Sequence, residues 1–420
     1  MNPHQVVITG LGLVTSIGNN RHEVLASLQS GTSGIDIHPQ LETDLSPVRL
    51  AGRIKGFEFP SIHPQSWQWP EGTVIPREEL TLLCPHGVYA RVALDEAIAH
   101  AGWSEEHLRN EETGLLTATG GSQFLNVLST QKVLQHGPLR VNPGNIVAAL
   151  PGGITYALNA AYGMRGASGG IVSACASSAQ ALGLAFDQIR TGKQQRMVVV
   201  GAEECDMYSI LPFASLRALT LSRDPTSSPC AFDTARDGFA LTGGAAVILL
   251  ETAELARQRG ARPLAEMIGW GWSSDGYSPT APEPEGRGIE RAMQQALQQA
   301  GISPAEVDYI NAHATSTLAG DRAEALALTR LFSGATPWIS STKSQTGHAL
   351  SMAGSLETAL CVLAMKNHLV PQNQNLRNPD SVAAKLRLAT RPEHAPLKHV
   401  LSNSSGFGGV NVSLLLRSAG

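Results

Sequence analysis

The sequence is poor in charge of either sign and has no basic excess. Charged residues make up 16% of the 420 residues, and 31 Lys and Arg stand against 35 Asp and Glu, which gives a net charge of −4. Nucleic-acid binding needs a basic footprint, so the composition gives no support to that class of function. The hydrophobic content of 42% predicts a globular protein rather than a disordered one.

Cysteine is scarce, and its spacing is irregular. The five cysteines include no CxxC pair, which argues against a disulfide framework or a zinc site. No apolar run approaches the roughly 18 residues needed to span a bilayer. The opening stretch "MNPHQVVITGLGLVTSIG" lacks the basic region of a signal peptide and predicts a buried strand and a turn. We therefore expect a cytoplasmic protein without membrane, nucleic-acid or metal partners.

Apolar β-branched runs alternate with helical patterns along the whole chain. The expected strands are at 6–10, 170–174, 197–204, 245–251, 307–313, 338–342 and 411–417, and the expected helices are at 87–102, 176–192, 288–301 and 354–367. This alternation predicts an α/β fold with covered sheets.

The chain also divides into two similar halves, at 1–250 and 251–420, with a seam in a helix at 251–263. Each half has a strand, a reactive residue and a helix in that order. Residues 32–80 are poorly patterned and contain several prolines, so they are expected to be surface loops.

Cys175 lies between the expected strand at 170–174 and the expected helix that starts near Ala176 and ends near Gly192. The first amides of a helix have no intrahelical partner and carry partial positive charge. They favour a thiolate and can hold a developing oxyanion. A buried structural cysteine would have the same local sequence, so this stretch alone leaves both interpretations open.

Three distant segments add candidates for chemistry. His313 ends an apolar strand, where α/β sheets place their sites. Lys343, His348 and Glu357 share one strand–loop–helix unit at 340–360. The stretch "NSSGFGGVN" at 403–411 has three glycines around Phe407, which suits close backbone approach or a pivoting loop.

Two other chemistries use some of the same residues. The spacing of the cysteine and the two histidines matches no zinc motif. A Cys/His/Asn hydrolase that uses Asn403 stays open, although it leaves Lys343 and the second histidine without a role.

These four segments, in this order, resemble the β-ketoacyl-acyl-carrier-protein synthases of the elongating type. The resemblance runs from "VVITGLGLVTSIGN" to "NSSGFGGVNVSLL" and includes "FDTARDGFALTGGAA" at 232–246 and "GDRAEA" at 320–325. It implies the thiolase fold, with two α/β halves packed as five αβαβα layers, and a dimer with itself or with a chain-length subunit. The implied partner is an acyl carrier protein. No cofactor of the chain's own is implied, because the phosphopantetheine arm belongs to the carrier.

The resemblance also implies roles for individual residues. Cys175 would take the acyl group, and His313 and His348 would stabilise the enolate formed by decarboxylation of a malonyl thioester. Lys343, paired with Glu357, would orient the histidines and tune their charge. The other implied residues are Phe407 and Gly408 for the oxyanion hole and gating loop, Thr315 and Thr317 for the pantetheine arm, Asp321 for support, and Arg77, Arg140, Arg217 and Arg223 for carrier docking.

The chain departs from the family pattern at three places. Ser405 stands where the family usually has phenylalanine, which either opens volume near the nucleophile or is refilled by a neighbour. The segment at 75–83 keeps only Arg77 as a basic residue, and "TGGAA" at 242–246 lacks the usual acidic residue. These departures favour a specialised polyketide or polyene synthase over an ordinary fatty-acid enzyme.

Other members of the wider superfamily fit less well. A non-catalytic chain-length subunit would typically lack the nucleophile. A degradative thiolase would have a second cysteine near its C-terminus, whereas Cys361 lies inside a helical pattern.

Overall fold

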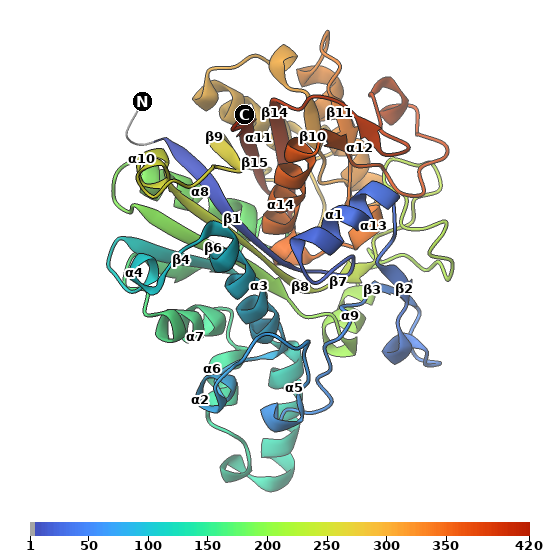
Figure 1. Cartoon of the computed structure of the whole chain (residues 1–420). Helices are drawn as coiled ribbons and strands as arrows, with labels where there is room; N and C mark the ends of the chain where they lie inside the picture. The colour runs from blue at the N-terminus through green and yellow to red at the C-terminus, as the bar shows by residue number, and fades with distance from the viewer. Residues whose placement is uncertain (1–4) are drawn as a thin grey trace.

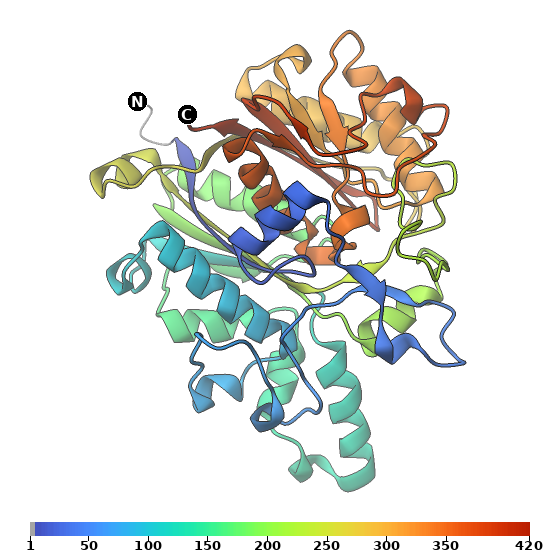
Figure 2. The same ribbon diagram turned by 45° about the vertical axis from the view of Figure 1, so that its right-hand side comes forward.

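A computed structural model describes residues 5–420, and its centre is one ten-stranded sheet (Figures 1 and 2). Its strands are β1 (Val6–Val14), β4 (Thr113–Ala118), β5 (Ser168–Gly170), β6 (Arg196–Glu203), β8 (Gly244–Thr252), β9 (Ala265–Ser274), β10 (Tyr309–Asn311), β11 (Trp338–Ser340), β14 (His399–Gly406) and β15 (Val410–Ser418). Two small sheets are formed by β2 (Ile35–Ile37), β3 (Leu50–Gly52) and β7 (Leu241–Thr242), and by β12 (Leu369–Val370) and β13 (Glu393–His394).

The two halves of the sheet repeat one strand order. The N-terminal half runs β1-β8-β6-β4-β5 in space and the C-terminal half runs β9-β15-β14-β10-β11. In each half the first strand of the chain lies beside the fifth, followed by the fourth, second and third. Antiparallel pairing of β1 with β9 joins the halves. This repeat confirms the predicted duplication of an α/β unit. The boundary after residue 250 stays a prediction, and β8 runs across it to Thr252.

Helices cover the sheet on both faces and also fill the space between its halves. They are α1 (Arg21–Ser30), α2 (Arg77–Leu80), α3 (Pro85–Ala101), α4 (Glu105–Leu108), α5 (Gln123–His136), α6 (Gly144–Ala149), α7 (Gly153–Tyr162), α8 (Ser177–Arg190), α9 (Met207–Ala214), α10 (Ala253–Gln258), α11 (Arg287–Ala300), α12 (Leu318–Leu331), α13 (Lys343–Thr346) and α14 (Ala353–Lys366). Helices α8 and α14 contact each other and strands of both halves. Helix α3 packs on β1 and β8, and α11 packs on β9 and β15. The result is the five-layer αβαβα arrangement, with α14 visible between the two groups of strands in Figure 1.

Some local expectations were wrong in detail. The strand expected at 170–174 ends at Gly170, because the following residues turn sharply toward α8. The strand expected at 307–313 is limited to Tyr309–Asn311. The seam helix expected at 251–263 is shorter, at Ala253–Gln258.

The segment at 32–80 is also more than a surface loop. It supplies β2 and β3, and it buries side chains that include Leu41, Ile54, Phe57 and Trp67. Despite its prolines, the segment contributes apolar side chains to two hydrophobic clusters that it shares with other parts of the chain.

Within residues 5–420, no helix has both the length and the hydropathy needed to cross a bilayer.

Replacement of Gly354 by alanine is expected to destabilise the central layer. A Cβ atom at this position of α14 would lie 2.3 Å from the backbone nitrogen of Ala179 on α8, so the two helices would have to separate. Overpacking of this kind costs about 1–3 kcal/mol. The denaturant midpoint of Gly354→Ala should therefore fall. Lys366→Ala on the exposed last turn of α14 is the control and should stay within about 0.5 kcal/mol of the parent. Equal midpoints for all three proteins would contradict this packing.

Candidate active site

Cys175 lies in the sharp turn between β5 and α8. Ala174 adopts a left-handed conformation with φ of 49°, which a non-glycine residue rarely takes. Ser177 accepts a hydrogen bond from the amide of Ser173 at 2.8 Å, and its hydroxyl donates to the carbonyl of Ala174 at 2.6 Å. The turn is thus held by the first residue of the helix that follows it.

His348 is the side chain in contact with the thiol. Its Nε2 atom lies 3.0 Å from Sγ of Cys175, and the residue is 1% exposed. The ring of Phe239 packs edge-on against the imidazole, with centroids 5.0 Å apart. The amide of His348 donates to the carbonyl of Ala240 at 2.8 Å, so both the backbone and the ring are fixed.

His313 follows β10 and lies beside His348, with ring centroids 5.4 Å apart and planes at 83°. Its position is set by Glu324 on α12, which accepts the amides of His313 and Ala314 at 2.9 and 2.8 Å. Sequence reasoning missed Glu324, and its only signal was its place inside the stretch "GDRAEA". The same carboxylate accepts a hydrogen bond from Nδ2 of Asn403 at 3.0 Å. Asn403 is therefore bound to a carboxylate and not to a histidine nitrogen, which does not match a Cys/His/Asn triad.

Lys343 and Glu357 form an ion pair beneath the histidines, with side chains only 3% and 2% exposed. Burial, strengthened by the Lys343 charge, lowers the pKa of His313 and of His348 well below the ordinary histidine value. Both imidazoles are therefore neutral near pH 7. Burial raises the pKa of Glu357 to about 7, against the opposing effect of Lys343.

The thiol itself is protonated in the resting protein. Burial raises the pKa of Cys175 to about 12, although the Lys343 charge and a hydrogen bond from the Phe407 amide both lower it. The start of α8 does not make a resting thiolate, because burial of the sulfur outweighs it.

The loop that joins β14 to β15 lies against the turn of the nucleophile. At Gly406, a Cβ atom would lie 2.5 Å from the carbonyl oxygen of Ser173, so only glycine fits there. The amide of Phe407 points at Sγ of Cys175. Gly408 has a φ of 84°, and its amide donates to the carbonyl of Pro279 at 2.8 Å. This loop therefore places one backbone donor at the sulfur.

Two cavities meet at Cys175 and Phe407. The first, which we call the entrance cavity, has a volume of about 320 Å³ and is lined also by His313, Thr315, Thr317, His348, Ser405 and Arg217. The second, the inner cavity, has a volume of about 280 Å³ and is lined also by Gln123, Glu203, Glu204, Ser209, Phe213 and Leu350. The nucleophile is thus reached from two sides.

The residues expected to contact the substrate arm line the entrance cavity. The hydroxyl oxygens of Thr315 and Thr317 are 3.1 Å apart. Ser405 lines the same cavity, and its hydroxyl donates to Oδ1 of Asn411 at 2.7 Å. Asn411 in turn donates to Asp275 at 2.7 Å. A polar chain of side chains, rather than a refilling apolar group, therefore stands where the family usually has a ring.

Asp321 has a supporting position, since it is fully buried and does not line the cavity. Its carboxylate accepts the amides of Phe232 at 2.8 Å and Thr317 at 3.2 Å. Glu203 was also missed from the sequence. It lines the inner cavity and accepts the amide of Gly120 at 2.8 Å and the hydroxyl of Ser351.

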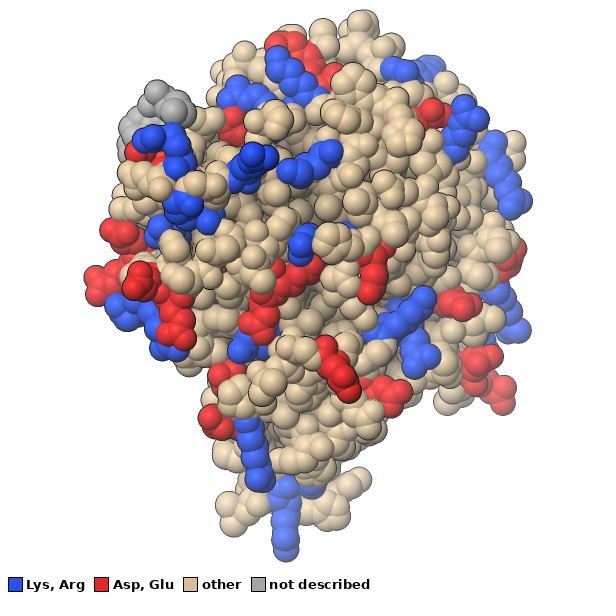
Figure 3. All heavy atoms as spheres, viewed as in Figure 1, with Lys and Arg blue, Asp and Glu red and all other residues tan. Residues whose placement is uncertain are grey.

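The four arginines expected to dock a carrier are spread over the molecule. Arg217 is exposed and lines the entrance cavity. Arg140, Arg223 and Arg77 on α2 are exposed elsewhere. On the face seen in Figure 3, basic and acidic side chains alternate without a broad patch of one sign.

Comparison with known proteins gives a consistent result. The family model described as the β-ketoacyl synthase N-terminal domain matches residues 4–256, and the model of the C-terminal domain matches residues 264–377. The chain is 36% identical over 418 residues to 3-oxoacyl-[acyl-carrier-protein] synthase 1 of Haemophilus influenzae, with 98% of each chain covered. It is also 36% identical over 424 residues to synthase 2 of Rhizobium meliloti, again with 98% of each covered.

Solved structures agree with this. A β-ketoacyl synthase from Burkholderia phymatum superposes with a TM-score of 0.89 at 32% identity, and 99% of each chain is covered. The ishigamide ketosynthase/chain length factor gives the same TM-score and coverage at 29% identity. Together with the Cys175, His313, His348 and Lys343 arrangement, these matches show that the chain belongs to the β-ketoacyl synthase family.

Proposed function

We propose that the chain is a 3-oxoacyl-[acyl-carrier-protein] synthase that condenses an acyl group held on Cys175 with a malonyl group held on a carrier protein. The observation that carries this proposal is the 3.0 Å contact between Sγ of Cys175 and Nε2 of His348, at the point where two cavities meet and with a second neutral histidine beside it. Membership of the family supports the reaction class.

In the first step, the sulfur of Cys175 attacks the thioester carbonyl of an acyl carrier. The carrier arm enters through the entrance cavity past Thr315 and Thr317, and the acyl chain extends into the inner cavity. A carbon–sulfur bond forms at Cys175 and the carbon–sulfur bond to the carrier breaks. Overall, the thiol proton of Cys175 passes to the departing carrier thiol.

The tetrahedral oxyanion of this step would be held by the amides of Cys175 and Phe407. Donors aimed at the place where charge develops provide electrostatic stabilisation, which is usually the largest contribution to rate. The Phe407 amide already points at the sulfur, which supports this role.

In the second step, a malonyl thioester enters and loses carbon dioxide. The electrons of the broken carbon–carbon bond become an enolate, whose oxygen takes hydrogen bonds from His313 and His348. The Nδ1 atoms of both rings are buried and have no partner among residues 5–420. A buried donor without a partner is rarer than a buried acceptor without one, so the ring proton belongs on Nε2, facing the substrate. The enolate carbon then attacks acyl-Cys175 and expels its thiolate as the β-ketoacyl carrier forms.

The partner proposed is an acyl carrier protein, with Arg217 at the mouth of the entrance cavity as its first basic contact. A dimer, of two copies or with a chain-length subunit, is proposed through the face around β5. This strand is the edge of the sheet, and the nearby side chains of Ile146, Tyr156 and Val172 are 70%, 58% and 65% exposed. The five cysteines are all free, which supports a reducing, cytoplasmic location.

The pathway proposed is a specialised polyketide or polyene pathway. The hydroxyl of Ser405 and its polar neighbours in the entrance cavity support this, since they stand where a ring is usual. Likeness to the ishigamide ketosynthase/chain length factor points the same way.

Cys175→Ala is expected to abolish acyl loading, because the acyl-accepting sulfur is gone. Intact-protein mass spectrometry after incubation with an acyl carrier should show the acyl adduct on the parent and none on the variant. Cys230→Ala is the control, since that thiol lines neither the entrance cavity nor the inner cavity, and it should load normally. Loading of Cys175→Ala would refute the assignment of the nucleophile.

Lys343→Met is expected to raise the pKa of both His313 and His348, because the Lys343 charge helps to hold those values low. Burial still lowers both pKa values in the variant, so its imidazoles take up protons below the ordinary histidine range but at a higher pH than those of the parent. A protonated imidazole hands its proton to the enolate, so malonyl carrier is converted to acetyl carrier without condensation. The ratio of acetyl to β-ketoacyl carrier, measured by mass spectrometry, should rise with acidity at a higher pH in the variant than in the parent. A ratio that changes with pH equally in both proteins would contradict this role of Lys343.

A further inference from the structure

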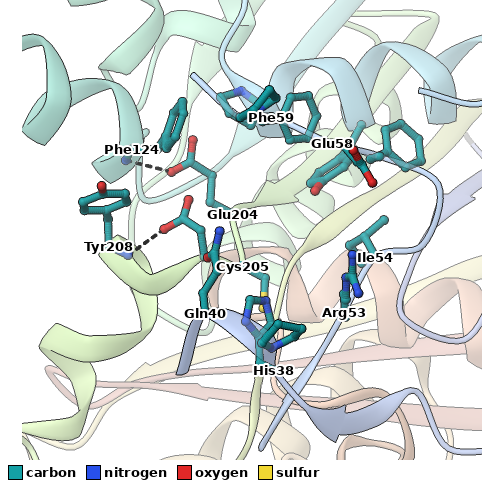
Figure 4. A pocket seen from close by; sticks show the side chains of 16 residues that line it. His38, Gln40, Arg53, Ile54, Glu58, Phe59, Phe124, Glu204, Cys205 and Tyr208 are labelled. Atoms are coloured by element: carbon teal, nitrogen blue, oxygen red, sulfur yellow. Dashed lines mark hydrogen bonds between the residues drawn. The ribbon is translucent and has the colours of Figure 1, made fainter. Parts of the chain in front are cut away.

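A third cavity, which we call the aromatic cavity, lies beside the inner cavity and opens at the surface (Figure 4). Its volume is about 270 Å³. Five aromatic rings line it, with charged and polar groups among them; the rings are Phe57, Phe59, Tyr89, Phe124 and Tyr208. The reaction described above leaves this cavity without a role.

The rings form two groups. Phe57 and Phe59 both pack edge-on against Tyr89, with centroids 4.9 and 5.5 Å away. Phe124 and Tyr208 also pack edge-on, with centroids 6.0 Å apart. Figure 4 shows Phe124 and Tyr208 together on one side of the cavity, with Arg53, Ile54 and Glu58 on the opposite side. Arg53 and Glu58 are exposed, whereas Glu204 is buried, so the cavity combines aromatic rings with charged groups at its rim and in its wall.

A single layer of side chains separates the aromatic cavity from the inner cavity. Glu204 lines both of them. On each side of it the chain alternates between the two spaces. Gln123 and Ser209 line the inner cavity, while their neighbours Phe124 and Tyr208 line the aromatic cavity. This layer is therefore one wall of the inner cavity, and a chain attached to Cys175 that fills the cavity contacts it.

Hydrogen bonds hold the carboxylate of Glu204 in place on the side away from Cys175. Its carboxylate accepts the amide of Phe124 at 3.2 Å and the hydroxyl of Ser122, and it lies 3.2 Å from Nδ1 of His86. Although burial lowers the pKa of His86, the neighbouring Cys84 and Glu204 raise it well above the ordinary value. The layer thus contains a paired, fully hydrogen-bonded carboxylate.

The same group is the one cluster of three possible metal ligands found within residues 5–420. Its geometry does not favour an ion. The two ring nitrogens of His86 face Thr119 at 3.0 Å and Glu204 at 3.2 Å. The sulfur of Cys84 is almost equally far from both nitrogens, at 3.2 and 3.4 Å, so it lies over the ring rather than in line with either lone pair.

The volumes set a length for the acyl chain. A cavity of about 150 Å³ holds one benzene molecule, so the inner cavity holds roughly ten carbon atoms and the aromatic cavity about as many again. The aromatic cavity is the space on the other side of the layer at Glu204, so the two cavities together have room for a longer chain.

We propose that the aromatic cavity is the distal subsite for the end of long, apolar or unsaturated acyl chains on Cys175, and that Glu204 is the gate between it and the inner cavity. This inference rests on the proposed condensing function and adds the class of acyl chain. Flat, unsaturated chain ends suit a space with aromatic faces and edges.

Photo-cross-linking tests where the chain end lies. Hexanoyl and hexadecanoyl carriers with a diazirine at the last carbon are loaded on Cys175 of the full chain, irradiated and mapped by peptide mass spectrometry. We expect the long probe to mark peptides that contain Phe57, Tyr89 or Tyr208, and the short probe to mark the inner cavity at Phe213 or Leu350. A long probe that marks only the inner cavity or no site near Glu204 would overturn the proposal while leaving condensation intact. Failure of either probe to load would overturn the proposed function itself.

A filling substitution gives an independent test. Gln40 is exposed and lines the aromatic cavity, so Gln40→Trp occupies the space with little risk to folding. It should lower the ratio of condensation with hexadecanoyl to hexanoyl substrate by about tenfold, since the chain end loses its apolar burial. Val74→Trp is the matched control, because Val74 is 83% exposed and outside the cavity, and its ratio should equal that of the parent.

Removal of the gate gives the opposite change. Glu204→Ala opens the layer and should raise the same ratio, whereas Glu204→Gln keeps the volume and should raise it less. An unchanged ratio in Gln40→Trp and in a folded Glu204→Ala protein would overturn the distal subsite.

Discussion

The buried ion pair between Lys343 and Glu357 is the interaction on which the rest of the site depends. Both side chains are almost without solvent contact, so the pair loses its hydration free energy. Mutual attraction of the two charges compensates for this loss only in part. A pair of this kind is a weak source of stability, and its value lies in where it puts one fixed positive charge. That charge lies under His313 and His348 and is the main neighbouring charge that lowers their pKa values.

The fold can hold this pair because it contains two copies of one α/β unit. Lys343 is the first residue of α13 and Glu357 is on α14, while Cys175 lies in the turn that leads into α8. Helices α8 and α14 occupy equivalent positions in the two halves and pack on each other in the central layer. Their contact at Gly354 and Ala179 is too close for a Cβ atom. The thiol from one half and the charges from the other are therefore brought together by the backbone packing that defines the architecture.

The sequence was sufficient for the class of fold, since strand and helix patterns predicted the duplicated α/β unit. The residue types around Cys175, His313 and His348 marked candidates, and the family resemblance gave them their predicted roles. The sequence was insufficient for residues whose role depends on contacts that only the fold creates. Glu324 reads as an ordinary helix residue, and only the fold shows that it holds the amides of His313 and Ala314. The state of the thiol was misjudged for the same reason, since the helix start is visible in the sequence and the burial of the sulfur is not.

The protonated thiol of Cys175 contacts one neutral imidazole, that of His348, and this arrangement controls the reaction. The thiol gives up its proton only while a thioester carbonyl is in place, because the negative charge then passes from the sulfur to an oxygen that faces backbone amides. Water that enters the cavities meets no resident thiolate and no free general base, since burial keeps the pKa of both histidines far below that of an effective base. The enolate is likewise offered hydrogen bonds but no acidic proton. The same low-dielectric environment that makes Lys343 and Glu357 costly to bury thus directs the carbanion toward the acyl group on Cys175 and away from water.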